Sequence, residues 1–103
     1  MAVSTVVIDF NGPGIYTVKA LEASKVVSLL MVAVTNLGGT AFQFEDTDGL
    51  QLTGPVILSD LHKFVTPFGT VAIPLCKTAS GKGLKLDIKS GGRLTGFAVI
   101  DIT

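Results

Sequence analysis

The segment Lys25–Thr35, KVVSLLMVAVT, constrains the fold most, because almost every position in it is apolar. Strand spacing would place Val26, Ser28, Leu30, Val32 and Val34 on one face, and Val27, Leu29, Met31 and Ala33 on the other. A strand that is apolar on both faces must be covered on both. One face can line a core, so the other needs a loop of the same chain or a second chain to cover it.

A helix over residues 20–34 is the alternative for this segment. Val26, Leu29, Leu30 and Ala33 would then share one helical face. The run is rich in β-branched residues and ends in Asn36-Leu37-Gly38-Gly39, which favours a strand.

Turn-forming residues divide the rest of the chain into short segments of alternating polarity. The alternation predicts strands over Ser4–Phe10, Ile15–Ala20, Lys25–Thr35, Thr40–Glu45, Val56–Leu58, Val71–Thr78, Leu84–Lys89 and Leu94–Ile102. Thr40–Glu45 is expected to be the hairpin partner of the central strand, and Ser90-Gly91-Gly92-Arg93 to be a turn. Residues 59–70 are expected to be irregular, because Pro67 and Gly69 interrupt them.

Eight strands without a helix predict one all-β domain over residues 1–103. The expected architecture is a two-sheet antiparallel sandwich of the jelly-roll type, and a five-stranded partial barrel competes with it. Residues 1–11 would form an N-terminal arm or an edge strand.

The composition favours self-association. Hydrophobic residues make up 48% of the chain and charged residues 16%, where about 25% charged is usual. No apolar run reaches the roughly 20 residues that a membrane helix needs. The N-terminus has no basic residue before its apolar part and carries Asp9 within it, so no signal peptide is expected and the chain should stay in the compartment where it is made.

The charges are balanced overall but unevenly distributed. Residues 1–60 hold six acidic and two basic residues, whereas residues 61–103 hold six basic and two acidic ones. Nucleic-acid binders normally carry a net basic excess with aromatic residues among the basic ones, and this chain has neither feature. No nucleic-acid partner is therefore expected.

No set of residues predicts an enzyme. Cys76 is the single cysteine and is best explained as a small buried apolar residue. Ser59, Asp60 and His62 are residue types found in hydrolytic triads, but within four positions they cannot easily adopt the triad geometry. Neither a catalytic residue nor a cofactor is predicted.

Binding sites for ions and sugars are weakly supported. Asp46-Thr47-Asp48-Gly49 resembles the start of a calcium loop, yet no glutamate follows it to complete one, so no metal is predicted. Gly81-Lys82-Gly83 and Gly91-Gly92-Arg93 lack the helix that a phosphate cradle needs. A sugar site would use aromatic faces, for which Tyr16 or an exposed loop residue such as Phe68 is the candidate.

The order of several motifs resembles a group of small bacteriophage virion proteins. The motifs are the apolar strand after an Ala/Ser/Lys turn (Glu22–Val34), F-x-F-x-D-x-x-G (Phe42–Gly49), L-x-G-P (Leu52–Pro55), a Gly-Lys-Gly-Leu turn and strand (Gly81–Leu86), and L-T-G-F-A-V-I (Leu94–Ile100). They lie within residues 21–102, about four fifths of the chain, and Ala2–Asn11 is outside the resemblance.

The resemblance implies a jelly-roll capsid decoration (cement) protein or a head or tail appendage, commonly a trimer seated on the shell. The expected partners are copies of the chain itself and the major capsid protein or another virion protein. The expected location is the virion surface, after synthesis in the host cytoplasm. A receptor- or glycan-binding module of a fibre or spike is the alternative.

A shell-binding protein needs apolar, self-complementary surface, and such a surface is expected from two parts of the chain. The arm Ala2–Asn11 is expected to pair with a neighbouring chain or the shell. The expected contact residues are Ala2, Val3, Ser4, Val27, Leu29, Met31 and His62.

Overall fold

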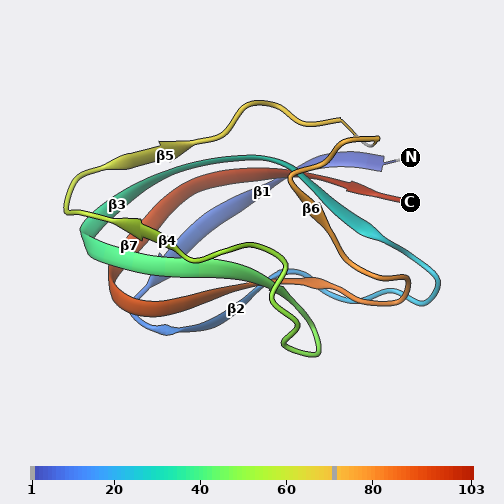
Figure 1. The fold of residues 1–103 in the computed structure, drawn as a ribbon, viewed down its shortest axis with the longest axis horizontal. Helices are drawn as coiled ribbons and strands as arrows, with labels where there is room; N and C mark the ends of the chain where they lie inside the picture. Colours follow the sequence, from blue (N-terminus) through green and yellow to red (C-terminus); the bar gives the residue numbers. More distant parts are fainter. Residues whose placement is uncertain (1, 71) are drawn as a thin grey trace.

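The computed structural model describes residues 2–70 and 72–103. The strands are β1 (Ala2–Asn11), β2 (Gly14–Lys19), β3 (Val27–Asp46), β4 (Val56–Leu58), β5 (Lys63–Val65), β6 (Cys76–Lys77) and β7 (Leu84–Ile102) (Figure 1). All seven belong to one antiparallel sheet, and the described residues contain no helix. The prediction of an all-β fold is confirmed.

Two long strands form the centre of the sheet. β3 and β7 pair antiparallel from Val27 opposite Ile102 to Asp46 opposite Leu84. All the shorter strands pair with one of these two. In Figure 1, β3 and β7 turn together at the left, and the chain turns from β1 into β2 at the same end.

Glycines permit this shared bend, which we call the corner. Asn11 to Gly14 leads from β1 to β2, and the bend of β3 lies between Leu37 and Thr40, opposite Arg93 to Gly91 of β7. The amide of Gly12 donates to the carbonyl oxygen of Gly92 at 2.8 Å, so the neighbouring segments stay joined through the bend. A backbone that must turn this sharply at close range favours residues without a Cβ.

The corner divides the sheet into two halves that face each other. Half-sheet 1 contains β1, β5, β6, residues 27–37 of β3 and residues 93–102 of β7. Half-sheet 2 contains β2, β4, residues 40–46 of β3 and residues 84–88 of β7. The rings of Phe42 in half-sheet 2 and Phe64 in half-sheet 1 meet edge-on at 5.9 Å.

The core lies between the half-sheets and draws on both. Its fully covered side chains come mainly from β3 and β7: Val27, Leu29, Val32, Val34, Phe42, Phe44, Leu84, Leu86, Ile88, Leu94, Ala98 and Ile100, joined by Ile8 and Val18. Burying each large aliphatic side chain contributes about 1.5–3 kcal/mol to folding.

Four expected elements differ in the structure. Residues 36–39 and 90–93 are not hairpin turns but the bends of two continuous strands, β3 and β7. The segment expected to be irregular holds β5, and the strand expected over Val71–Thr78 is reduced to Cys76–Lys77, with Val71 outside the described residues. Strand pairing explains the first two differences. A pair of glycines fits either a hairpin turn or a bend within a strand, and only the position of the neighbouring strand decides between them.

Candidate functional site

An apolar row crosses the outer face of half-sheet 1. Val7 of β1 lies opposite Phe97 of β7, Phe97 lies opposite Ala33 of β3, and Ala33 lies opposite Val65 of β5. Val7 is 74% exposed, Val65 61% and Phe97 38%. Side chains directly opposite in a sheet lie within contact distance, so these four form a continuous band across four strands, which we call the apolar row.

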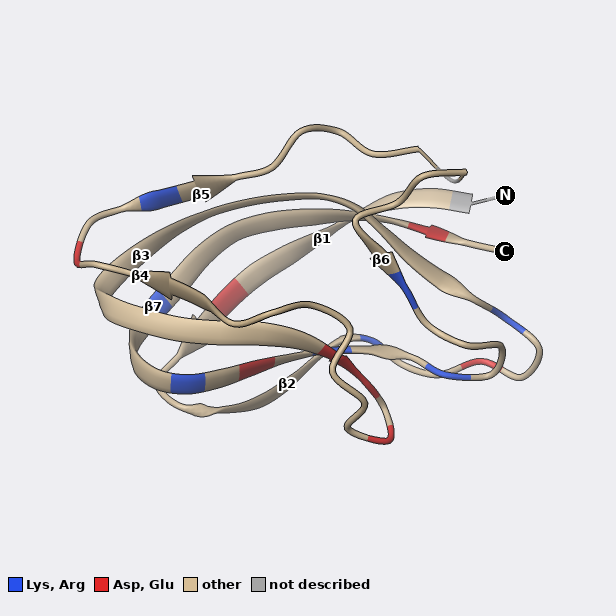
Figure 2. Cartoon of the chain, in the orientation of Figure 1, with Lys and Arg blue, Asp and Glu red and all other residues tan. Residues whose placement is uncertain are grey.

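The next row toward the chain ends is less exposed. Thr5, Val99 and Met31 lie side by side on β1, β7 and β3, but Val99 is buried and Met31 half-buried, while Val3 follows on β1 with 54% exposure. Figure 2 shows that β3 carries no charged residue along most of its length. An exposed apolar surface that spans several strands is typical of a protein contact rather than of a solvated sheet face.

Charged side chains border the apolar row on its corner side. Arg93 lies 2.8 Å from Asp9 across β7 and β1, and Lys63 of β5 lies opposite Thr35 of β3. Both members of the Arg93–Asp9 pair are about half exposed, so the pair adds little to stability. A polar rim around an apolar centre is the usual anatomy of a protein interface.

The central strand supplies only part of the surface predicted for it. The prediction that Val27 and Leu29 face outward with Met31 is wrong, because both are at most 2% exposed in the core. The ladder shifts register between Leu29, opposite Ile100, and Met31, opposite Val99, so Leu30 is an extra residue. Such a bulge interrupts the alternation of faces, and only Met31 and Ala33 of the predicted set remain on the outer face.

The N-terminal contact residues lie on β1. Val3 and Ser4 are exposed, and Ala2 pairs with Ile102. Over its whole length β1 pairs with β7 of the same chain, so one backbone edge of the expected arm is already used within the molecule.

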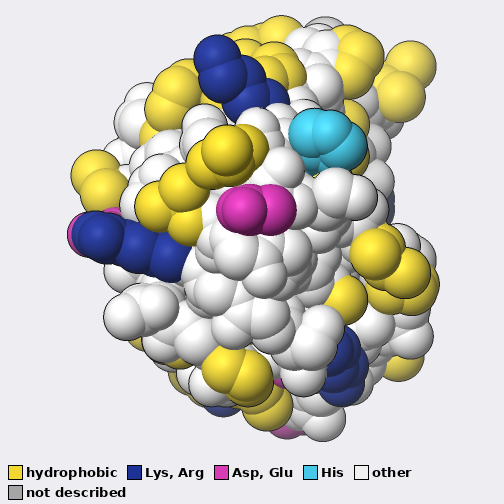
Figure 3. All heavy atoms as spheres, turned by 90° about the vertical axis from the view of Figure 1, so that its left-hand side faces the viewer, with side chains coloured by type: hydrophobic (Ala, Val, Ile, Leu, Met, Phe, Trp, Pro, Cys, Tyr) yellow, Lys and Arg dark blue, Asp and Glu magenta, His cyan; other side chains and the backbone are white. Residues whose placement is uncertain are grey.

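His62 lies apart from the other predicted contact residues. It is exposed at the end of the molecule seen in Figure 3, where its backbone carbonyl accepts a hydrogen bond from Asn36 at 3.0 Å. Asp60 accepts a hydrogen bond from the amide of Gly38 at 2.6 Å. Ser59 binds through its backbone, accepting from the Asn36 side chain at 2.6 Å. Asp60 and the Ser59 backbone thus hold the β4–β5 connection against the corner.

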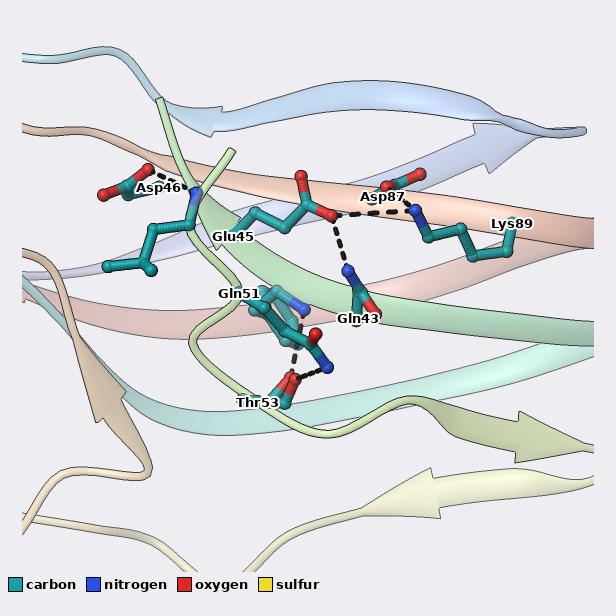
Figure 4. A network of polar contacts seen from close by, with 9 residues as sticks. Gln43, Glu45, Asp46, Gln51, Thr53, Asp87 and Lys89 are labelled. Carbon is teal, nitrogen blue, oxygen red and sulfur yellow. Dashed lines mark hydrogen bonds and ion pairs between the residues drawn. The ribbon is translucent and has the colours of Figure 1, made fainter. Parts of the chain in front are cut away.

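A polar network that the sequence pattern did not predict covers the outer face of half-sheet 2 (Figure 4). Gln43 donates to Glu45 at 2.6 Å, and Lys89 lies 2.6 Å from Asp87 and 3.9 Å from Glu45. Gln43, Glu45 and Asp87 are each at most 9% exposed. Register explains the cluster, because Gln43 of β3 lies opposite Asp87 of β7, and single-strand alternation carries no such information.

Lys89 lowers the pKa of Asp87 in this network. Its hydrogen bond to Asp87 is the largest cause that holds the pKa of Asp87 below its ordinary value, against the opposing effect of burial. The hydrogen bond to Asp87 likewise raises the pKa of Lys89. The two carboxylates thus share one lysine as counter-ion, and Glu45 also accepts a hydrogen bond from the Gln43 amide, which is the pattern of a structural ion-pair network.

The Asp46–Gly49 turn uses its carboxylate internally. One oxygen of Asp46 accepts from the amides of Asp48 and Leu50 at 2.8 and 2.9 Å, and Asp48 forms an ion pair with Lys82. Across residues 2–70 and 72–103 no three His, Cys, Asp or Glu side chains cluster closely enough to hold a metal ion.

The remaining candidates have structural surroundings. Cys76 is half-buried next to Leu29, and burial raises the pKa of its thiol to about 11. Tyr16 stacks on Phe10 with ring centres 4.4 Å apart, and its hydroxyl donates to the carbonyl of Asn11 at 2.9 Å. Phe68 is 62% exposed. Of the two aromatic candidates for a sugar site, Tyr16 already has one face and its hydroxyl engaged.

An apolar cavity of about 140 Å³ lies between the half-sheets, on the side away from β1 and β2. Its walls are Leu29, Val32, Phe44, Thr53, Val56, Phe64, Thr66 and Leu75. Sequence alternation alone could not place it, because its walls come from five separate segments of the chain.

Comparisons with protein-family models, with curated proteins and with solved structures each find no match to this chain. Among the described residues, no helix is long and apolar enough to cross a membrane.

Proposed function

We propose that this chain is a jelly-roll structural protein of a bacteriophage virion, a capsid decoration protein that stabilises the outer shell through self-association and shell contacts. The strand order supports the jelly roll. If β3 and β7 are each divided at the corner and β5 and β6 are counted as one strand, the chain has eight segments. Half-sheet 1 then has the order 1-8-3-6 and half-sheet 2 the order 2-7-4-5, the antiparallel arrangement of an eight-stranded jelly roll.

The observation that carries the proposed function is the apolar row Val7–Phe97–Ala33–Val65. Water contact of this surface is unfavourable by about 25 cal/mol for each Å² of apolar area, so association is favoured once a matching surface is present. We propose that the row is the contact between copies, assembled as a trimer, and that the assembled particle binds the major capsid protein. The low charge content and the resemblance to small virion proteins agree with this role.

Two lysine variants test the contact between copies. Val7→Lys and Val65→Lys each place a charge in the apolar row, while Ile57→Lys places one at a 79% exposed position on half-sheet 2. Sedimentation equilibrium at micromolar concentration should give a trimer for the wild type and for Ile57→Lys, and a monomer for the two row variants. A monomeric wild type would overturn the proposed self-association.

Shell binding is tested with undecorated capsids. The wild-type protein should co-sediment with capsids and raise the temperature at which they release their genome or collapse. The row variants should bind more weakly, because a trimer that engages several sites gains avidity that a monomer lacks. Absence of co-sedimentation with head shells, with retained trimer formation, would move the proposal from the head to another virion surface.

The alternative is a receptor- or glycan-binding module of a fibre or spike, and the exposure of Phe68 favours it. An exposed aromatic ring can cover the apolar face of a sugar. A glycan array that gives saturable binding with the wild type and none with Phe68→Ala would support this alternative over a decoration role.

A further inference from the structure

The walls of the apolar cavity expose almost no polar surface. Its two threonines are the only polar side chains among the walls, and the oxygen of each hydroxyl accepts a backbone hydrogen bond. Thr66 Oγ1 accepts from the amide of Val32 at 3.0 Å, and Thr53 Oγ1 accepts from the amide of Phe44 at 3.0 Å. Each hydroxyl therefore serves the backbone of β3, and the surface left for an occupant is carbon.

The volume of the cavity restricts its occupant to a small group. About 140 Å³ is close to the cavity of about 150 Å³, lined by aliphatic and aromatic side chains, that stays dry and binds benzene. Sites for free metabolites are usually larger, roughly 300–1,000 Å³, and contain a few polar groups that fix orientation. A single aromatic or branched aliphatic group fits this cavity, and a polar metabolite does not.

The position of the cavity points to a polypeptide as the source of that group. Val56 of β4 and Phe64 of β5 stand on its two sides, and within the described residues each of these strands pairs with β3 alone. Both are therefore edge strands, whose outer backbone groups can pair with an added strand. In strand addition, backbone pairing supplies affinity and a pocket for one side chain supplies specificity.

We propose that this cavity is the anchor pocket for one apolar side chain of an extended segment of a partner protein, which pairs with the edge of β4 or β5. The cavity lies between the half-sheets, whereas the apolar row lies on the outer face of half-sheet 1, so the inference goes beyond the proposed virion role and does not depend on it.

Benzene tests the pocket itself. In methyl-labelled wild-type protein, benzene should shift the methyl signals of Leu29, Val32, Val56 and Leu75 saturably, and leave those of Val7 unchanged. Val56→Phe and Leu75→Phe fill the cavity from two different walls and should abolish the shifts. The test needs only one of these two variants to be folded. Ile57→Phe adds the same ring one residue away at an exposed position and should bind benzene as the wild type does. Unchanged wall signals in the wild type would overturn the pocket.

Displayed peptides test the occupant. Random extended peptides selected on the wild type, with Val56→Phe as the counter-selection target, should converge on Phe, Leu or Ile at one fixed position. Alanine at that position should weaken binding at least tenfold, and Ile57→Phe should still bind the selected peptides. Selection that yields no fixed apolar position, despite benzene binding, would show that the pocket does not serve a polypeptide.

Discussion

Gly91 crosses Gly39 at the corner so closely that a Cβ added to Gly91 would overlap the carbonyl oxygen of Gly39. Gly92 stands in the same relation to the carbonyl oxygen of Leu37. The φ angle of Gly91 is 105°, a conformation that side chains rarely permit. The close approach of β7 to β3 at the bend, and with it the stacking of the two half-sheets, depends on these missing side chains.

The Gly91→Ala variant should therefore be strongly destabilised. Overpacking against backbone together with a strained φ is expected to lower the free energy of unfolding by roughly 2–5 kcal/mol, measured by urea denaturation. Gly54→Ala is the matched control, because it has open space around it and an ordinary φ. Its stability should be unchanged or higher by up to about 1 kcal/mol. Equal stability of the two variants would contradict the close-packed corner.

The corner also shows what the sequence could and could not predict. Alternation located the apolar segments around Gly38–Gly39 and Gly91–Gly92 and the all-β class. It could not distinguish two hairpin turns from two bends in paired strands, because glycine suits both and the choice depends on residues about fifty positions away. Pairing between β3 and β7 determines the bend, and the spacing of residues within one segment carries no information about that pairing.

The candidate surface was predicted in part for a related reason. The apolar excess of the central strand predicted that it needs cover on two sides, and Met31 and Ala33 do lie on the outer face. The extra residue at Leu30 reversed the facing of Val27 and Leu29, and nothing in KVVSLLMVAVT marks that position. Val7, Phe97 and Val65 join the surface only through the register of three other strands.

Replacing Thr66 by valine tests the hydrogen bond at the cavity wall. The variant keeps the shape of the side chain but leaves the buried amide of Val32 without its acceptor. The expected loss is about 1–3 kcal/mol of unfolding free energy in urea titrations. Thr17→Val, at an exposed position of β2, should change stability by less than about 0.5 kcal/mol. A neutral Thr66→Val would mean that the Thr66 hydroxyl does not satisfy this amide.

The Cys76 thiol should react slowly in the folded protein. Burial raises its pKa to about 11 from an ordinary value of 9.0. Since the thiolate is the reactive form, the thiolate fraction at pH 8 should be about a hundredfold lower than in the unfolded chain. Iodoacetamide labelling should therefore be slow at pH 8, accelerate up to about pH 11 and become fast in urea. Rapid labelling of native protein at pH 7 would contradict the buried environment.

Lys89 should control the acid stability of half-sheet 2. Because its hydrogen bond lowers the pKa of Asp87, the stabilisation is present above the ordinary pKa of 3.8 and is lost as the pH falls through the lower, folded-state value. Lys89→Met should raise the Asp87 pKa, seen by carboxyl ¹³C NMR titration, and shift acid unfolding to higher pH. Lys77→Met, an exposed lysine on β6, should leave the titration of Asp87 unchanged. An Asp87 titration that is insensitive to Lys89→Met would rule out this pair.

Asp101 should reduce the stability of the fold. It lies on β7 between Val3 and Ser28, is 0% exposed, and has no hydrogen-bond partner for either carboxylate oxygen among the described residues. A buried polar group without a partner costs about 1–3 kcal/mol, and an ionised one costs more. Asp101→Asn, which keeps the size, and Asp101→Leu, which removes both oxygens, should each raise the free energy of unfolding, the leucine variant by about 1–3 kcal/mol.

Urea titrations at pH 7 measure the effect of the Asp101 variants, with Asp9→Asn as the control. Asp9 is half exposed and pairs with Arg93, so its replacement should change stability by less than about 1 kcal/mol in the opposite direction. If Asp101→Leu raises the stability but Asp101→Asn does not, the amide introduced by Asp101→Asn is as poorly solvated at this position as the carboxylate. If both Asp101 variants lose stability instead, the carboxylate must accept a hydrogen bond in the folded protein. A polar contact, rather than apolar packing, then stabilises the end of half-sheet 1 that lies away from the corner.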